Sequence, residues 1–374
     1  MKKIMKHPIP RTLFLLPCLL GCLSIISLTV FTTDLLGDTT GKPVSSKKPG
    51  FFFDCDNTLQ RPCKKLVADY NGKPITIEPS SVAWSDRYNK AIVVSDNYND
   101  LVQHKAPHYV IVYFGLAENE SKITVKPLLT PKQAAEFPLY DLEGVTLQGD
   151  RLYTIGSLAL HGKDPSRDRW ERHQFVQMEL RQIKNSNMLG AENLAHVTRR
   201  WPNFRDWLIS KSGHSWTAEE TRGRAEAEGI NIEALSITDV GTVMMGFRGP
   251  LTSEGGAMAI EFKLPDSPDN EPVFVKKYAL PQVDFPDVPK GTPKTLRAMV
   301  EVPGKPGEFY VLLGPKGYEK EEIVISHWNT KTGQLSKTTR LPEGFVAEGV
   351  APIAEGKLLI VDDLEEMIMI ATEN

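Results

Sequence analysis

The sequence predicts an all-β protein with the fold of a β-propeller. Five blades are expected, and six is the alternative count. A short motif recurs five times along the 374 residues, always in the same phase. Each copy precedes an apolar run at a similar distance, so each unit is expected to fold as strand, tight turn, strand. Repetition of short strand units is typical of propellers. The chain also holds 28 Gly and 27 Pro, which suits an architecture with many turns.

The repeated motif centres, in its clearest copies, on a glutamate followed by a small residue. Those copies are Asp141-Leu-Glu-Gly-Val-Thr, Asn231-Ile-Glu-Ala-Leu-Ser and Ala347-Glu-Gly-Val-Ala. Two weaker copies fit the same frame, Ser80-Ser-Val-Ala-Trp and Arg297-Ala-Met-Val-Glu. The repeats follow one another directly, and the amino-acid composition does not change along them. We therefore predict one propeller domain over residues 51–374.

Residues 1–33 are expected to be a targeting segment, either a signal peptide or an N-terminal membrane anchor. Three lysines and Arg11 precede an uncharged stretch, residues 12–33, that is about long enough to span a bilayer. The basic residues should stay cytoplasmic, which places the rest of the chain on the periplasmic or extracellular side. Leu19-Leu-Gly-Cys resembles a lipobox, but the apolar run continues beyond it, so lipidation is the least favoured alternative. Residues 34–50 are polar and are predicted to be a linker.

Two cysteines, Cys55 and Cys63, lie beyond the targeting segment. A disulfide is expected, because their short separation closes a loop readily and exported proteins meet an oxidising compartment. Two free thiols, or half of a metal site, are the alternatives. No other cysteine follows and no histidines cluster nearby, which argues against zinc.

The fifth unit begins near Val346 and offers only three strands. A strand from residues 51–78 is expected to complete it, because this closes the ring without leaving an exposed edge.

Residues 162–230 interrupt the repeat of strand units, and a helical insertion is predicted around residues 185–229. Thr217-Ala-Glu-Glu has the pattern of a capping box, and Gly229 suits a helix end. The segment is rich in aromatic residues: Trp201, Phe204, Trp207 and Trp216. Two alternatives stay open: the insertion lies across one face of the ring as a lid, or it packs its tryptophans on the flank.

The first strand of each propeller blade lines the central channel, so equivalent positions in successive blades form a ring that faces the axis. We call this predicted set the axial ring. Its members are Ser80, Glu143, Glu233, Arg297 and Glu348. Like charges held this close require a cation, a proton or the arginine as a counterion.

Three interpretations of the axial ring are open. Glu143, Glu233 and Glu348 could bind a hard cation, for which Ca²⁺ is the best candidate because it accepts irregular oxygen sets. Arg297 could instead pair with two glutamates and form a structural polar network. The glutamates could also accept hydrogen bonds from backbone N–H groups of neighbouring blades. The arginine network is the interpretation that we favour from the sequence.

Further polar residues follow the second strands and are predicted to share one rim of the ring: Asp96, Ser157, Arg248, Lys316 and Asp362. Arg248 is the predicted anion contact, because the surrounding Gly246-Phe-Arg-Gly-Pro fixes the backbone around a bidentate donor.

The composition of the chain and the absence of several enzyme motifs exclude some classes of function. The formal net charge is −3, which argues against nucleic acid as a partner. The sequence lacks a Gly-x-Ser-x-Gly elbow, a His-Glu-x-x-His pair, a Cys-x-x-Cys motif and a phosphate-binding P-loop. Two functions remain: a binding or scaffolding propeller for a small molecule or protein, and a metal-assisted hydrolase of phosphate esters or lactones. No general base is evident, which favours the binding propeller.

Several of these segments also resemble a known family. Asp141-Leu-Glu-Gly-Val, Asn231-Ile-Glu-Ala-Leu-Ser, Met245-Gly-Phe-Arg-Gly-Pro-Leu and Ala257-Met-Ala-Ile resemble the bacterial family catalogued as domain of unknown function 3616. The likeness covers roughly residues 75–371. That family is itself similar to the esterase-like phytase and SdiA-regulated propellers in its Glu-Gly motifs. Here Ala234 stands where Gly is usual, and Ser80 and Arg297 replace Glu in two units. The resemblance implies an exported propeller and no established activity.

Overall fold

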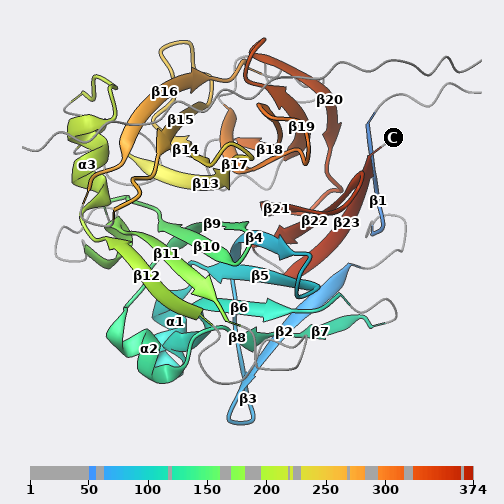
Figure 1. Ribbon diagram of the computed structural model, residues 1–374. Helices are drawn as coiled ribbons and strands as arrows, with labels where there is room; N and C mark the ends of the chain where they lie inside the picture. Colours follow the sequence, from blue (N-terminus) through green and yellow to red (C-terminus); the bar gives the residue numbers. More distant parts are fainter. Residues whose placement is uncertain are drawn as a thin grey trace, which may run out of the picture. The chain divides into compact units, whose positions relative to one another are not determined.

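The five repeat units of the sequence correspond to five sheets in the described part of the chain, which confirms the predicted β-propeller (Figure 1). The structure is a computed structural model. It describes residues 50–55, 63–116, 120–160, 170–181, 195–217, 220–221, 229–267, 270–282, 294–315, 323–363 and 366–373, without the side chains at 98–99.

Four blades are built from consecutive antiparallel strands, with the inner strand first. Blade one contains β4 (Pro79–Ser85), β5 (Lys90–Ser95), β6 (Ile111–Phe114) and β8 (Lys126–Pro127). Blade two contains β9 (Leu142–Gln148), β10 (Arg151–Gly156), β11 (Phe175–Leu180) and β12 (Ala195–Trp201). Blade three contains β13 (Asn231–Ile237), β14 (Thr242–Gly249), β15 (Met258–Lys263) and β16 (Val273–Ala279). Blade four contains β17 (Lys294–Glu301), β18 (Glu308–Pro315), β19 (Val324–Asn329) and β20 (Gln334–Arg340).

Blade five combines strands from both ends of the described chain. β21 (Ala347–Ala354), β22 (Lys357–Asp362) and β23 (Met367–Glu373) are followed in the sheet by β2 (Lys64–Tyr70) and β3 (Lys73–Ile75). β1 (Phe51–Phe53) also pairs with β23, and β7 (Lys122–Thr124) pairs with β2 in parallel. The expected strand from residues 51–78 is therefore confirmed as the closing element. The segment 122–127 is divided between two blades, since β8 completes blade one whereas β7 pairs with β2 of blade five.

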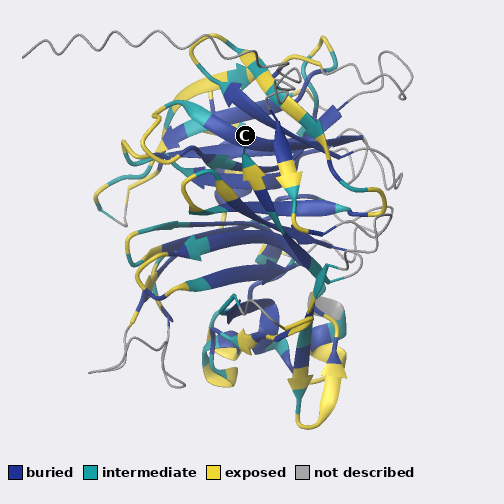
Figure 2. Ribbon diagram, turned by 90° about the vertical axis from the view of Figure 1, so that its right-hand side faces the viewer, coloured by how far each residue is buried: buried dark blue, intermediate teal, exposed yellow. Residues whose placement is uncertain are grey.

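The inner strands form a closed ring around the channel. β4 contacts β9, β9 contacts β13, β13 contacts β17, β17 contacts β21, and β21 returns to β4. Burial decreases outward along each blade (Figure 2): β13 is almost wholly buried, whereas the outer strand β20 alternates exposed and half-buried residues. This alternation is what a strand shows when only one face is covered.

The helical insertion is shorter than predicted. Ala195–Trp201, which we expected to be helical, is the outer strand of blade two, because β11 offers it an edge with matching register. The helix α3 (Phe204–Lys211) follows, and the rings of Phe204 and Trp207 pack at a tilt against Phe262 of blade three, with centroids 5.4 Å apart in both pairs. The capping box forms, since the amide of Glu220 donates to Thr217 Oγ1 over 3.1 Å and the amide of Thr217 donates to Glu220 Oε2 over 2.6 Å. The described helix thus packs on the flank of the ring, as the second alternative stated.

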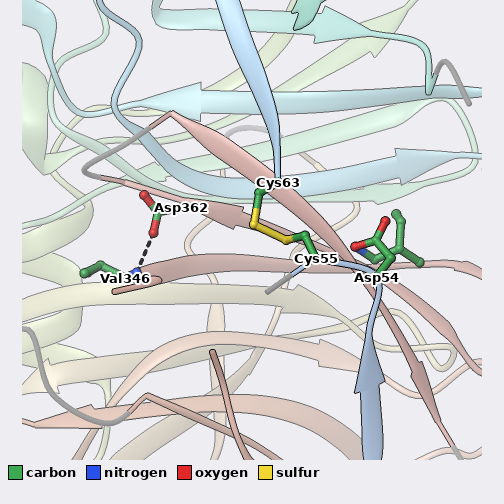
Figure 3. The surroundings of a disulfide bond; sticks show 6 residues. Asp54, Cys55, Cys63, Val346 and Asp362 are labelled. Carbon is green, nitrogen blue, oxygen red and sulfur yellow. Dashed lines mark hydrogen bonds between the residues drawn. A yellow bond between two sulfur atoms is a disulfide. The ribbon is translucent and has the colours of Figure 1, made fainter. Parts of the chain in front are cut away.

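The predicted disulfide between Cys55 and Cys63 is present, with a Cα–Cα separation of 4.9 Å (Figure 3). It joins the segment after β1 to the segment before β2, and both strands belong to the closing blade. The helices in the described ranges are too short or too polar to span a bilayer. The predicted targeting segment, residues 1–33, lies outside the described residues.

Candidate functional site at the axis of the propeller

Every residue of the axial ring occupies a β-bulge in an inner strand. The pairing of β4 with β5 passes from Pro79 directly to Ser81, and Ser80 is left without a partner in the ladder. The same register shift occurs at Glu143, Glu233, Arg297 and Glu348. A bulge leaves one residue unpaired and re-aims its side chain. The fivefold repeat of the motif is thus a fivefold repeat of one bulge.

The small residue after each bulged position has a packing reason. A Cβ atom at Gly349 would lie 2.8 Å from the backbone nitrogen of Val82 and 2.6 Å from Val361 Cγ2. A Cβ atom at Gly144 would lie 2.6 Å from Leu235 Cβ. Val82 and Leu235 belong to the inner strand of the next blade, whereas Val361 belongs to β22 in the same blade as Gly349. The Glu-Gly motif therefore combines a bulge that turns a side chain with a close approach that only Gly or another small residue allows.

Three carboxylates and two guanidinium groups meet at the axis. Glu143, Glu233 and Glu348 each offer an oxygen, and these oxygens all lie within 4.8 Å of one another. Arg297 Nη1 lies 2.5 Å from Glu348 Oε1 and 3.8 Å from Glu233 Oε2. Arg248 Nη1 lies 2.8 Å from Glu233 Oε1. All five side chains are buried. We call these five residues the axial site.

Glu143 differs from the other two glutamates of the axial site. Among the described residues it forms no ion pair with Lys, Arg or His, whereas Glu348 contacts Arg297. Burial, and then the negative charges of Glu233 and Asp141, raise the pKa of Glu143 well above its usual value. Burial and the charge of Glu233 also raise the pKa of Glu348, although Arg297 acts in the opposite direction. The arginines thus neutralise one side of the site and leave the Glu143 side acidic.

Ser80 and Asn231 complete the surroundings in different ways. The hydroxyl of Ser80 donates to the carbonyl of Leu142 in blade two, and its oxygen also lies 3.2 Å from the carbonyl oxygen of Val94 in blade one. Asn231 is buried, its Nδ2 lies 3.3 Å from Glu233 Oε1, and its Oδ1 has no hydrogen-bond partner. The axial position of Ser80 followed from the motif alignment. The amide of Asn231 was not predicted, although it stands two residues before Glu233.

The predicted rim residues separate into distinct environments. Arg248 belongs to the axial site, since it is buried against Glu233. Ser157 donates to Asp141, which also pairs with Arg172 at 2.7 Å. Asp362 accepts from the amide of Val346 at the start of blade five (Figure 3). Lys316 lies outside the described residues.

Asp96 is the rim residue that joins a second carboxylate cluster. Glu78, Asp96 and Asp363 each offer an oxygen within 4.8 Å of the other two. Glu78 and Asp363 were missed in the sequence. Their positions could have indicated them, because Glu78 lies two residues before Ser80 and Asp363 directly follows Asp362. Both lie at the same end of the strands as the axial site.

A cavity of about 760 Å³ lies at the opposite end of the inner strands. Trp84, Leu147, Val300 and Ile353, near the ends of four inner strands, are among its lining residues. None of the five axial-site residues lines it. The buried charges of the axial site therefore lie at one end of the inner strands, and a cavity with both apolar and polar lining residues lies at the other.

No family model matches this chain, and no curated protein matches it. Solved structures of similar arrangement exist at low identity. The β-propeller domain of Myceliophteria thermophila Cps50 (Swd1) is 10% identical, with a TM-score of 0.33 over 82% of this chain and 84% of that domain. A luciferin-regenerating enzyme is 10% identical, with a TM-score of 0.34 over 80% of this chain and 92% of its own. A Trichoderma reesei protein of Carbohydrate-Active Enzymes Family AA12 is 10% identical, with a TM-score of 0.40 over 91% of this chain and 100% of its own.

These similarities concern the fold and leave the activity open. The resemblance to the domain of unknown function 3616 stays a prediction. The chemistry of the site must therefore be argued from its own residues.

Proposed function

We propose that this protein is a binding propeller that holds a divalent cation, best Ca²⁺, at the axial site, and that a ligand binds on the same rim. The observation that carries the proposal is the convergence of Glu143, Glu233 and Glu348 with their oxygens within 4.8 Å. Ca²⁺ binds oxygens at about 2.3–2.6 Å, so two ligands on opposite sides of the ion lie up to about 5 Å apart. The spacing of the three carboxylates fits such an ion.

The charges of the site support a cation over a closed arginine network. Three carboxylates face two guanidinium groups, which leaves one formal negative charge on this group of five side chains. Glu143 forms no ion pair with Lys, Arg or His among the described residues, and a buried carboxylate requires a counterion or a proton. The unpartnered Oδ1 of Asn231 adds a neutral oxygen of the type that Ca²⁺ accepts. Arg248 and Arg297 would then hold Glu233 and Glu348 in a fixed orientation around the ion.

The test is a calorimetric titration of Ca²⁺ into protein stripped of metal. We expect stoichiometric binding at the axial site and a melting temperature that rises with Ca²⁺ by mass action. Glu143→Gln should remove this binding while keeping the arginine contacts of Glu233 and Glu348. If the arginines neutralise the site instead, Ca²⁺ should leave the melting temperature of the wild type unchanged. Arg297→Met should then be the more damaging variant, at about 3–5 kcal/mol, because it strands buried carboxylates.

The alternative function, a metal-assisted hydrolase of phosphate esters or lactones, depends on the same cation. A bound cation would polarise the substrate or activate water. Turnover of a chromogenic phosphate ester or lactone by the Ca²⁺-loaded wild type, lost in Glu143→Gln, would support hydrolysis. Binding without turnover of either substrate would leave the binding propeller as the function.

The exported location is also part of this proposal. The Cys55–Cys63 disulfide supports it, because stable disulfides are typical of oxidising compartments. Labelling of intact cells with a membrane-impermeant reagent should modify the exposed lysines of the propeller. Labelling only after lysis would contradict an extracellular location, and labelling after release of the periplasm would indicate a periplasmic one.

A further inference from the structure

The cluster formed by Glu78, Asp96 and Asp363, which we call the seam cluster, joins two blades. Glu78 directly precedes β4, and Asp96 directly follows β5, so both belong to blade one. Asp363 directly follows β22 in blade five. These are the blades that meet where the ring closes. The cluster therefore bridges the seam between the first and the last inner strand.

Asp363 is the buried member of the seam cluster, Glu78 and Asp96 are half-buried, and the carboxylates are incompletely satisfied. Asp363 is only 8% exposed, and its Oδ1 is buried without a hydrogen-bond partner. Asp96 Oδ1 is likewise buried without a partner. A buried acceptor left unsatisfied costs about 1–3 kcal/mol, and more when it is charged. Two such oxygens within one cluster of three carboxyl groups require a proton or a cation between them.

The positive charge that acts on the cluster is that of Arg297, which opposes the rise in the pKa of Asp363 without forming an ion pair with it. Glu78 Oε1 accepts from Asn97 Nδ2 over 2.9 Å, a neutral donor. Among the described residues, neither Glu78, Asp96 nor Asp363 forms an ion pair with Lys, Arg or His. Burial, followed by the charge of Asp363, raises the pKa of Asp96 well above its usual value, which shows how unfavourable three free carboxylates are here. The spacing within 4.8 Å again matches the reach of Ca²⁺.

We propose that Glu78, Asp96 and Asp363 bind a second divalent cation, best Ca²⁺, which ties blade five to blade one across the seam of the ring. The proposal rests on its own residues and does not require a cation at the axial site. A neighbouring hydrogen bond crosses the same seam, from the amide of Ile77 to Glu366 Oε1 over 2.6 Å. The cation would add an ionic link to this hydrogen bond. Its role is to stabilise the closed ring.

The decisive experiment counts Ca²⁺ ions per chain by calorimetric titration of the metal-free full-length protein. We expect two ions for the wild type, one for Asp96→Asn, one for Glu143→Gln and none for the double variant. Asp100→Asn is the matched control, because it removes a nearby carboxylate that lies outside the cluster and pairs with His104. This control should keep two ions.

Each other result identifies which proposal fails. A single ion that is lost in Glu143→Gln and kept in Asp96→Asn would overturn the seam cation and leave the axial cation intact. A single ion lost only in Asp96→Asn would do the reverse. Binding that is unchanged in both variants, or absent from the wild type, would overturn both assignments.

The variants are chosen so that a loss of stability does not affect the number of bound Ca²⁺ ions. Asp96→Asn removes like-charge repulsion, so the metal-free variant should melt no lower than the metal-free wild type. Glu78→Gln serves as a second variant and should also lose one ion. Hydrogen exchange adds a local readout: Ca²⁺ should slow exchange in β22 and β4 of the wild type at least threefold, and should not do so in Asp96→Asn. Equal slowing in both proteins would count against a cation at the seam.

Discussion

Single residues decide whether the acidic end of the channel is stable without a cation. Asp363 lies in the seam cluster, and burial, followed by the charges of Glu78 and Glu233, raises its pKa from 3.8 to about 7. Glu143 and Glu348 in the axial site are shifted in the same direction by burial. The folded protein thus holds protons that the unfolded chain releases.

This difference predicts how stability depends on pH in the absence of metal. A raised carboxyl pKa contributes stability that is fully present below the unfolded pKa, near 4, and is lost as the pH rises through the folded pKa, here about 7 for Asp363. The metal-free protein should therefore melt at a higher temperature at pH 5 than at pH 8. Scanning calorimetry after exhaustive chelation measures this difference.

Asp363→Asn provides the control for this pH dependence. The amide does not titrate, so the difference in melting temperature between pH 5 and pH 8 should shrink in the variant. Saturating Ca²⁺ should also shrink it in the wild type, because the cation favours the ionised carboxylates. A metal-free protein that melts higher at pH 8 than at pH 5 would contradict the assigned shifts.

At the scale of the strand, the same local structure, a β-bulge followed by a small residue, is repeated around the axis. Each inner strand contains a bulge at the ring residue, and a small residue follows it. The bulge directs the side chain, and the small residue allows the neighbouring inner strand to approach. The two features are needed together, because a larger residue after the bulge would push the blades apart where the side chains converge.

Gly349→Ala tests this pairing of bulge and close approach. The added methyl group would meet the backbone of Val82 and Ser81 in the next blade, at 2.8 and 3.0 Å, and backbone atoms give way less easily than side chains. We expect a loss of about 1–3 kcal/mol, as for other overpacked sites. Denaturant unfolding of the variant provides the value.

Ala234→Gly is the matched control for Gly349→Ala, because Ala234 holds the equivalent position in blade three and already carries a Cβ atom. The reverse change should cost no more than about 1 kcal/mol, through backbone entropy. If Gly349→Ala were as harmless as the control, the close approach would not explain the Glu-Gly motif.

The sequence predicted which residues meet in the axial ring, but not the β-bulges that direct their side chains to the axis. Aligned motifs placed Glu143, Glu233 and Glu348 at one height, because equivalent positions in a repeat must coincide in space. The bulges could not be predicted, since they are defined by pairing with a second strand. Glu78 and Asp363 were missed for a related reason: they lie outside the motif and meet only because the first and last blades become neighbours.

At the scale of the whole molecule, the closure of the ring depends on β2 and on the disulfide beside it. β2 adds to β23, and β1 pairs with the other part of the same strand. The Cys55–Cys63 bond connects the two segments that carry β1 and β2. Ile370 of β23 also donates to Asp54 over 2.7 Å, across 316 residues of sequence.

Removing the disulfide should destabilise the closed ring. The bond closes a loop with a sequence separation of 8, for which chain entropy predicts about 2–3 kcal/mol. The double variant Cys55→Ala/Cys63→Ala should show this loss in reversible denaturant unfolding. Addition of reductant should lower the stability of the wild type and leave the double variant unchanged. Equal stability of the oxidised wild type and the double variant would show that β1 and β2 hold without the bond.

The sequence also predicted this closure, since the last unit was one strand short. The extent of the insertion was predicted less well. Ala195–Trp201 has polar and aromatic residues that suit an amphipathic helix, yet the open edge of β11 recruits it as a strand. Tertiary pairing decided the outcome there, and local sequence alone does not contain that information.

The composite fifth blade has a consequence for the order in which the protein is made. β2 leaves the ribosome early, whereas its partner β23 is synthesised last among the described strands. Until β23 arrives, the growing chain carries an unpaired strand edge and an open arc of blades. Such an edge is prone to pair with other chains. A factor that shields this edge during synthesis would therefore raise the yield of folded protein, and the need for it should end when β23 has been synthesised.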